Sequence, residues 1–313
     1  MSDRPNRRAP LRRRLVPLLL LVMVGCGGGP PPADPPAATV DAGLAAERRL
    51  AQSAFRARSY EQAAVLYGRV LERAYARDDL VMIGDAGYEL AIVELRRGRP
   101  RAAATLAARN RAGLTRRGAA PFPELFLVEA FARWRLDELD SARRLLAETG
   151  AAAGRPAAAL TSRIAYLQGL LAAAARDRAG LAAALAALDD SVLPLVRADR
   201  DELAGRLALL DDDPTGALTA FERAIATRRA AGAFDTLPDS LALAGRAALA
   251  ADQPRRAADL YLRAGRSAHE QGQIDDARRW LGEALRIARG TGQAMVRREA
   301  QDRLRALSAP SPS

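Results

Sequence analysis

The chain has no lysine, one cysteine and one histidine, and each scarcity excludes a class of chemistry. Without lysine there is no Schiff-base nucleophile, no serine–lysine dyad and no P-loop lysine to bind phosphate. The single cysteine, Cys26, cannot form an intramolecular disulfide. The single histidine, His269, provides neither a histidine-rich metal site nor an obvious base for a serine or cysteine nucleophile. The sequence therefore predicts a protein that is not an enzyme and holds no cofactor or metal.

Aromatic residues are also scarce, at 4%, and the positive charge is diffuse. The net charge of +11 includes six arginines and one aspartate within residues 1–25, a net +5, which leaves +6 for the other 288 residues. Nucleic-acid binders usually cluster arginine on one face and interleave aromatic side chains for base stacking. We therefore expect no nucleic-acid partner.

Residues 1–25 have the organisation of an export signal. Six arginines lie between residues 4 and 14, an apolar run extends from Leu15 to Val24, and Gly25-Cys26 follows. Ten apolar residues rise only about 15 Å as a helix, whereas the hydrocarbon core of a bilayer is roughly 30 Å thick. A cleaved signal therefore fits better than a permanent membrane span, and the paired arginines leave twin-arginine export open.

The segment Met23-Val24-Gly25-Cys26 resembles the lipobox of bacterial lipoproteins, although leucine is more usual where Met23 stands. The resemblance implies that residues 1–25 are a lipoprotein signal peptide and that Cys26 carries the lipid. Gly27 is not the aspartate that retains many such lipoproteins at the inner membrane. The implied location is thus the inner leaflet of the outer membrane, facing the periplasm. An ordinary secretory signal with a chance cysteine at its end is the alternative.

Residues 26–40 combine Cys26 with a segment rich in proline and glycine that cannot build a core. Its prolines favour an extended chain at about 3.1 Å per residue, so it reaches roughly 40 Å. We expect a linker that holds the body off a membrane, or a disordered spacer of no special length. Residues 309–313 are expected to be a disordered tail.

The body, residues 41–308, is predicted to be all-helical, because apolar residues recur at spacings of three and four nearly throughout. Residues that break helices interrupt this pattern at regular intervals and predict about fourteen helices. The breaks are Arg58-Ser59, Gly98-Arg99-Pro100, Asp137-Glu138, Arg176-Asp177, Asp211-Asp212-Asp213-Pro214, Asp252-Gln253-Pro254 and Gln271-Gly272-Gln273. The three aspartates before Pro214 are expected to cap a helix.

Residue types also repeat about every 40 residues, which is typical of stacked structural repeats. One column consists of alanines, each soon after a break: Ala63, Ala103, Ala142, Ala182, Ala217 and Ala257. A mostly small residue stands twelve positions earlier in each copy: Ala51, Ala91, Ala130, Leu170, Gly205 and Gly245. A third column, four positions after each alanine, includes the bulky Tyr67, Phe221 and Tyr261.

This pattern resembles the tetratricopeptide repeat, most clearly where Ala63, Ala217 and Ala257 precede Tyr67, Phe221 and Tyr261. The resemblance implies a right-handed α-solenoid of stacked antiparallel helical hairpins. A period near 40, against 34 for the standard repeat, means that the helices are longer by a turn or that the units are merely similar hairpins. A second phase, with Ala277 and Leu281, competes for helix 255–271, and the pattern is weak between 150 and 195.

The first helices of such repeats line a concave groove, and the register directs a set of mostly cationic side chains toward it. The set consists of Arg48, Gln52, Arg56, Tyr88, Arg96, Arg206 and Arg246. These residues predict a groove for an acidic peptide, a terminal carboxylate or another anionic partner. The alternative is a solvated helix face in an arginine-rich protein. Trp134 and Trp280 are expected to be packing or interface anchors.

The leading functional hypothesis is a membrane-anchored envelope scaffold that binds protein partners through this groove. One alternative is a periplasmic binding protein for an anionic small molecule or lipid. Another is a wall-cleaving enzyme that uses a single glutamate as acid and base, for which Glu94 and Glu129 are the glutamates considered. Because no catalytic signature surrounds either glutamate, the binding hypotheses rank first.

Overall fold

The computed structural model of the chain describes residues 42–154, 158–188 and 192–308. These residues belong to one compact unit, Ala42–Ser313. The predicted signal peptide, the lipidation site Cys26, the linker and the tail lie outside the described residues. No described helix has both the length and the apolar character needed to cross a membrane.

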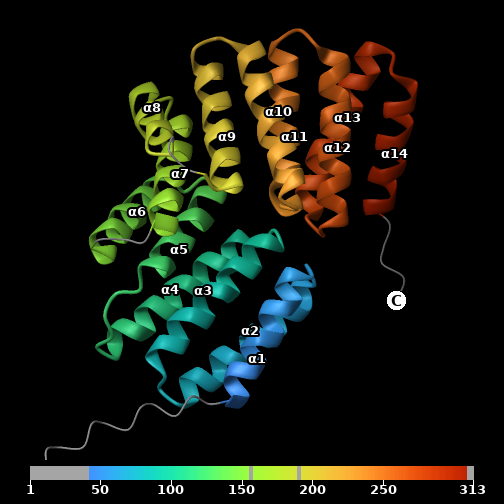
Figure 1. Cartoon of the computed structure of the whole chain (residues 1–313). Coiled ribbons are helices and arrows are strands. Elements are labelled where there is room, and N and C mark those ends of the chain that lie inside the picture. The colour runs from blue at the N-terminus through green and yellow to red at the C-terminus, as the bar shows by residue number, and fades with distance from the viewer. Residues whose placement is uncertain (1–41, 155–157, 189–191, 309–313) are drawn as a thin grey trace, which may run out of the picture. The chain divides into compact units, whose positions relative to one another are not determined.

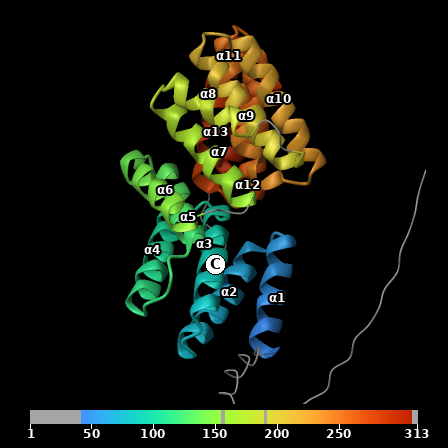
Figure 2. The same ribbon diagram turned by 60° about the vertical axis from the view of Figure 1, so that its left-hand side comes forward.

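The described residues form fourteen α-helices, one short 3-10 helix (η1) and no strand, which confirms the predicted all-α fold (Figure 1). Their bounds in chain order are α1 Ala42–Arg56, α2 Tyr60–Ala76, α3 Leu80–Arg96, α4 Pro100–Arg116, α5 Pro123–Arg135, α6 Leu139–Ala153, α7 Ala158–Ala174, α8 Arg178–Ala186, α9 Pro194–Leu210, α10 Pro214–Ala230, η1 Phe234–Thr236, α11 Leu237–Ala250, α12 Pro254–Glu270, α13 Ile274–Thr291 and α14 Ala294–Ser308. Consecutive helices pack on each other along the chain, as Figures 1 and 2 show. The predicted solenoid of helical hairpins is therefore confirmed.

Most consecutive helices are joined by the same three-residue turn, and each break predicted from the sequence coincides with one. After α1, Arg58 adopts a φ of 61°. The amide of Ser59 then donates to the carbonyl of Ala54 at 2.9 Å, the bond that closes a Schellman motif. The carbonyl of Ser59 in turn accepts from the amide of Ala63, and this hydrogen bond closes the first turn of α2. One short turn thus ends a helix and starts the next.

The turn before α10 shows why aspartate and proline recur at these breaks. Asp212 takes the left-handed conformation, with a φ of 55°. The side chain of Asp213 accepts from the amide of Gly216 at 2.8 Å, and Pro214 occupies the first helical turn, where a missing N–H costs nothing. The expected capping role of this acidic run is confirmed for Asp213.

The 40-residue period follows from the lengths of the elements. Helices α2, α3 and α4 each have 17 residues. Two such helices with two three-residue turns span 40 residues, so each helix is nearly one turn longer than in a 34-residue repeat. The stretch where the pattern is weak contains α8, which has only nine residues.

The small and bulky columns of the repeat meet where neighbouring helices cross. A Cβ atom on Gly205 of α9 would lie 2.6 Å from the ring of Phe221 in α10. On Gly245 of α11 it would lie 3.0 Å from the ring of Tyr261 in α12. Gly265 of α12 faces Leu281 of α13 in the same way, at 2.6 Å. The two repeat registers that compete for α12 are therefore both present in the structure, because α12 packs on α11 and on α13.

Candidate functional site

A cavity of about 510 Å³ is lined mainly by the odd-numbered helices from α3 to α13. These are the first helices of the hairpins, which the sequence pattern directed toward a groove. The volume lies within the range of roughly 300–1,000 Å³ that is typical of ligand pockets. The cavity is therefore the natural candidate for a binding site.

Large apolar side chains form much of the cavity wall. Trp134 and Phe131 come from α5, Tyr166 from α7, Tyr261 from α12 and Trp280 from α13. The rings of Phe131 and Tyr166 pack with their centroids 6.2 Å apart. Both tryptophans expected to be packing or interface anchors thus reach the same space. Such a wall favours binding of apolar groups.

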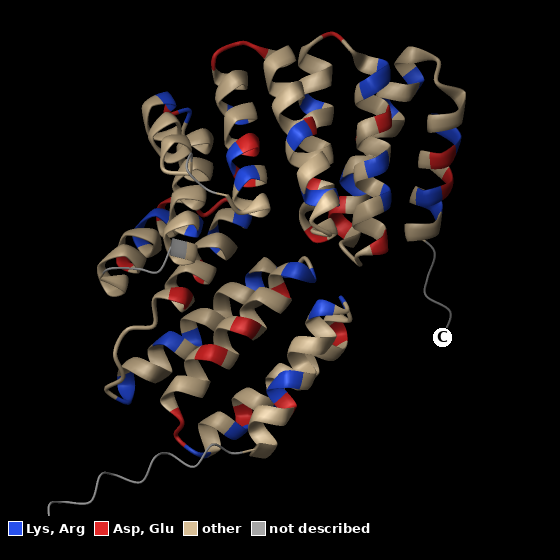
Figure 3. Ribbon diagram, in the orientation of Figure 1, with Lys and Arg blue, Asp and Glu red and all other residues tan. Residues whose placement is uncertain are grey.

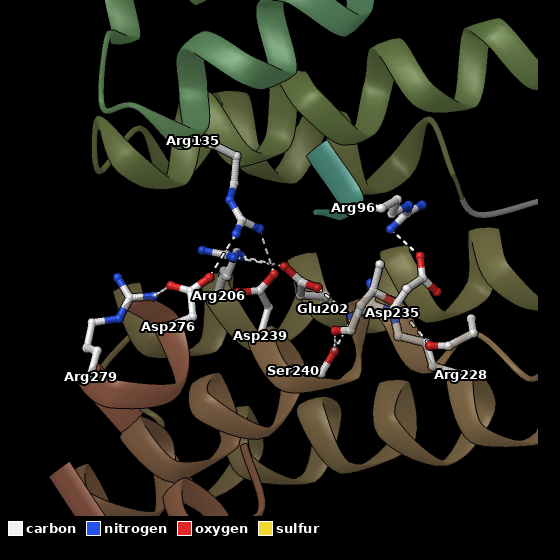
Figure 4. Close-up of polar contacts among 12 residues, drawn as sticks. Arg96, Arg135, Glu202, Arg206, Arg228, Asp235, Asp239, Ser240, Asp276 and Arg279 are labelled. Atoms are coloured by element: carbon white, nitrogen blue, oxygen red, sulfur yellow. Dashed lines mark hydrogen bonds and ion pairs between the residues drawn. The ribbon is translucent and has the colours of Figure 1, made fainter. Parts of the chain in front are cut away.

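A buried network of charges lies beside this aromatic wall, around Arg228 at the end of α10 (Figure 4). Arg228 is 2% exposed. Its guanidinium lies 2.7 Å from Glu202 Oε2 and 2.7 Å from Asp199 Oδ1, and it also donates to Ser240 Oγ. Arg206 donates to the remaining oxygen of Glu202 at 2.8 Å. The network fastens α9, α10 and α11 together at the cavity.

The two carboxylates of this network differ in acidity. Burial would raise the pKa of Glu202, but the charges of Arg228 and Arg206 outweigh it and lower that pKa to about 2. Partial burial raises the pKa of Asp199, whose side chain is 31% exposed, to about 6 against the opposing effect of Arg228. Glu202 is thus ionised at neutral pH, whereas Asp199 titrates just below neutral pH.

Further polar contacts join the cavity walls between segments that are far apart in sequence. Arg135 of α5 lies 2.8 Å from Asp239 of α11 and 3.2 Å from Asp276 of α13, and Arg96 of α3 pairs with Asp235 of η1. Figure 4 shows Arg135 and Arg96 pointing at these acids. In every case the arginine belongs to the earlier helices and the carboxylate to the later ones. These ion pairs connect α3 and α5 to η1, α11 and α13 at the cavity.

Arg58, in the turn after α1, also contacts a later segment of the chain. Its guanidinium lies 4.5 Å from the centroid of the Phe234 ring and donates to the carbonyl of Gly232. Elsewhere in the described residues, arginines and acids are interspersed on most helices (Figure 3).

Four of the seven predicted groove residues line the cavity: Tyr88, Arg96, Arg206 and Arg246. The other three lie outside its wall. Arg48 pairs with Glu89 at 3.0 Å and Asp85 at 2.8 Å, while Gln52 donates to Glu89 at 3.2 Å. Arg56 is exposed at the end of α1. That any of the seven binds a partner stays a prediction.

The sequence interpretation missed the acidic half of the cavity. In α9, Asp199, Glu202 and Arg206 follow one another at spacings of three and four, which places them on one helix face. The register that directed Arg206 inward therefore directs both acids inward too, and counting only cations hid this. By contrast, nothing local in the sequence indicates that Arg135 meets Asp239.

The two glutamates considered for catalysis lie outside the cavity wall and serve in ion pairs. Glu129 is 4% exposed and lies 3.1 Å from Arg111 and 3.5 Å from Arg133. Glu94 pairs with Arg97 at 2.6 Å. Within residues 42–154, 158–188 and 192–308, no three His, Cys, Asp or Glu side chains gather in a way that could hold a metal ion.

Comparison with known proteins shows a similarity of fold and no sequence relative. No protein-family model matches the chain, and no curated protein matches its sequence. A solved Rap protein complexed with Competence and Sporulation Factor superimposes with a TM-score of 0.62 at 12% identity, covering 85% of this chain and 76% of that one. A tetratricopeptide repeat protein from Parabacteroides merdae gives 0.44 at 11% identity, covering 82% and 98%. Aspartyl phosphate phosphatase F from Bacillus subtilis gives 0.47 at 12% identity, covering 85% and 74%. The superposition on the Rap protein thus shows that the described unit shares its helical-repeat fold.

Proposed function

We propose that this chain is a lipid-anchored scaffold of the bacterial cell envelope that binds a segment of a partner protein in its cavity. The observation that carries the proposal is the cavity of about 510 Å³ on the first helices of the repeats. Its wall contains both aromatic and charged side chains. Tryptophan, tyrosine and arginine are the residues that most often dominate binding energy at protein interfaces. All three line this space.

The most similar fold reported above supports a binding role. The Rap protein in that structure is complexed with Competence and Sporulation Factor, so a solenoid with a related arrangement of helices holds a partner. We infer the same class of activity for this chain. Its partner is expected to be an envelope protein or peptide.

The anchor is the second part of the proposal and rests on the sequence. Cleavage before Cys26, lipid attachment there and a proline-rich linker would hold the repeat unit near a membrane. The favoured site is the periplasmic face of the outer membrane. In this proposal the anchor determines the location of the repeat unit, and the cavity determines which partner the protein binds.

Photo-crosslinking inside the cell tests the binding proposal. A benzoylphenylalanine at Leu243 of α11 would face the cavity, whereas the same residue at Leu249 of that helix lies outside the cavity lining and is 39% exposed. We expect a discrete crosslinked protein from position 243 and none from position 249. Equal products at both positions, or none at 243, would refute binding of a partner protein in the cavity.

A second candidate function is a binding protein for a free anionic small molecule. The enclosure of the cavity by ion pairs favours it, and so does Arg246, which lines the cavity and has no ion pair among the described residues. Crosslinking to protein would be absent from position 243 in that case. The same cavity would then be occupied by a metabolite.

A further inference from the structure

The arginines of the cavity are not all neutralised. Most of them face a carboxylate, as Arg228, Arg206, Arg135 and Arg96 do. Arg163 of α7 donates to the hydroxyl of Tyr88. Arg246 of α11 makes no hydrogen bond or ion pair with any described residue, although it lines the cavity. Positive charge is therefore left over where a ligand would sit.

The surroundings of Arg246 locate this unpaired positive charge within the cavity. Arg206 and Arg246 line the same cavity, and burial and the charge of Arg206 lower the pKa of Arg246, which has no acid of its own. Arg206 donates from Nε and Nη2 to a single oxygen of Glu202, at 3.1 and 2.8 Å. Its Nη1 has no partner among the described residues. Two cationic donors thus line the same cavity.

The neighbouring wall is apolar. Leu243 lies one turn before Arg246 on α11 and lines the cavity with it. Tyr261 of α12 packs its ring against Gly245 and also reaches the cavity. A ligand with one anionic group would place that group at the arginines and an apolar body against these side chains. Guanidinium groups hold carboxylates and other oxyanions through paired hydrogen bonds.

We propose that Arg246, with Arg206 beside it, is an anion-binding subsite, and that the cavity takes an amphipathic anion, one oxyanion group on an apolar body. The inference rests on the proposed binding function and deepens it by naming the chemistry of the ligand. The oxyanion is supplied by an acidic residue of a bound peptide or by a free organic acid. Both sources share the chemistry that Arg246 recognises.

A matched pair of fluorescent probes tests the subsite on the purified full chain. 8-Anilinonaphthalene-1-sulfonate and N-phenyl-1-naphthylamine share one aromatic body, and only the first carries an anionic group. We expect the sulfonate to bind the unaltered protein more tightly than the neutral probe. In Arg246→Gln its affinity should fall about tenfold or more, as expected for loss of a charged hydrogen bond. The neutral probe should bind both proteins equally.

Arg289→Gln is the matched control, because Arg289 of α13 is exposed and lies outside the cavity wall. Sulfonate binding should be unchanged in this variant, and circular dichroism should show that both variants keep their helices. If the sulfonate binds no better than the neutral probe, the subsite is refuted. It is also refuted if Arg246→Gln binds the sulfonate as tightly as the unaltered chain.

Displacement of the sulfonate separates the two sources of the anion. The competitors are acetylated, amidated pentapeptide mixtures with one aspartate among apolar residues, and the same mixtures with asparagine. Displacement by the aspartate mixture alone supports both the subsite and peptide binding. If neither peptide mixture displaces the sulfonate and sulfonate binding still depends on Arg246, the subsite is supported for a free organic acid. The same result counts against peptide binding. The subsite and the proposed function can therefore fail separately.

Discussion

Replacing Arg228 with methionine should destabilise the protein more than any single exposed substitution. The change keeps most of the aliphatic stem and removes the guanidinium that contacts Glu202, Asp199 and Ser240. The side chain of Glu202 is 4% exposed, so water cannot replace the guanidinium that it would lose. Its pKa of about 2 shows that the carboxylate is ionised in the folded protein. Arg228→Met therefore leaves a buried charge short of one counterion.

The magnitude follows from the geometry. Removing one partner of a buried ion pair typically costs about 3–5 kcal/mol. Arg206 still lies 2.8 Å from Glu202 after the change and compensates part of the charge. We therefore expect a loss of about 3 kcal/mol, at the lower end of that range. The loss concerns the free energy of unfolding of the helices that carry the network, α9 to α11.

Urea denaturation followed by circular dichroism measures this loss, with Arg229→Met as the control. Arg229 is the next residue of α10 and is exposed, so its replacement should change the free energy of unfolding by about 0.5 kcal/mol or less. The double variant Arg228→Met, Glu202→Gln removes both charges and should recover half or more of the loss. A loss below about 1 kcal/mol in Arg228→Met, or strict additivity in the double variant, would refute the buried network as described.

Three further predictions concern packing, pH and the anchor. Gly245→Leu should lower the free energy of unfolding by roughly 1–3 kcal/mol, because even a Cβ atom would lie 3.0 Å from the Tyr261 ring; an unchanged thermal melt would contradict the repeat register. The pKa of Asp199 is about 6 in the folded protein against an ordinary value of 3.8, so folding favours its protonated form. Stability from this group is present below about pH 3.8 and lost as the pH rises through about 6, so the melting temperature of the unaltered protein should fall relative to Asp199→Asn over that window. A constant difference between the two melting temperatures would count against the burial of Asp199. Cys26→Ser should move the protein from the membrane to the soluble fraction without altering its helices, and unchanged fractionation would exclude lipid attachment at Cys26.

The helices and their packing could be predicted from the sequence because their determinants are local. Asp212 and Pro214 encode the end of one helix and the start of the next within a few residues. Gly205 and Phe221 mark a helix crossing through residue size alone, at a spacing that the repeat fixes. Such signals need no knowledge of the rest of the molecule. The short α8 and its surroundings departed from the period and gave the weakest pattern.

The cavity could be predicted only in part, because its chemistry depends on pairs of distant residues. The register placed Arg206 and Arg246 among the predicted groove residues, and both line the cavity. It could not show that Glu202 neutralises the first and that nothing described neutralises the second. The pairing of Arg135 with Asp239 joins residues 104 positions apart, and no local pattern encodes it. Charge alone therefore predicted a cationic groove, whereas the structure shows a cavity in which most arginines pair with a carboxylate and Arg246 has no described partner.

The most direct test of the central claim is the affinity of the partner captured by crosslinking for two tryptophan variants of α11. Leu243→Trp would fill part of the cavity, whereas Leu249→Trp makes the same change on the same helix outside the cavity lining. Titration calorimetry should show binding weakened about tenfold or more by Leu243→Trp and unchanged by Leu249→Trp, since only the first occupies space that the partner needs. Equal affinity for the two variants would contradict the claim that the cavity is the binding site.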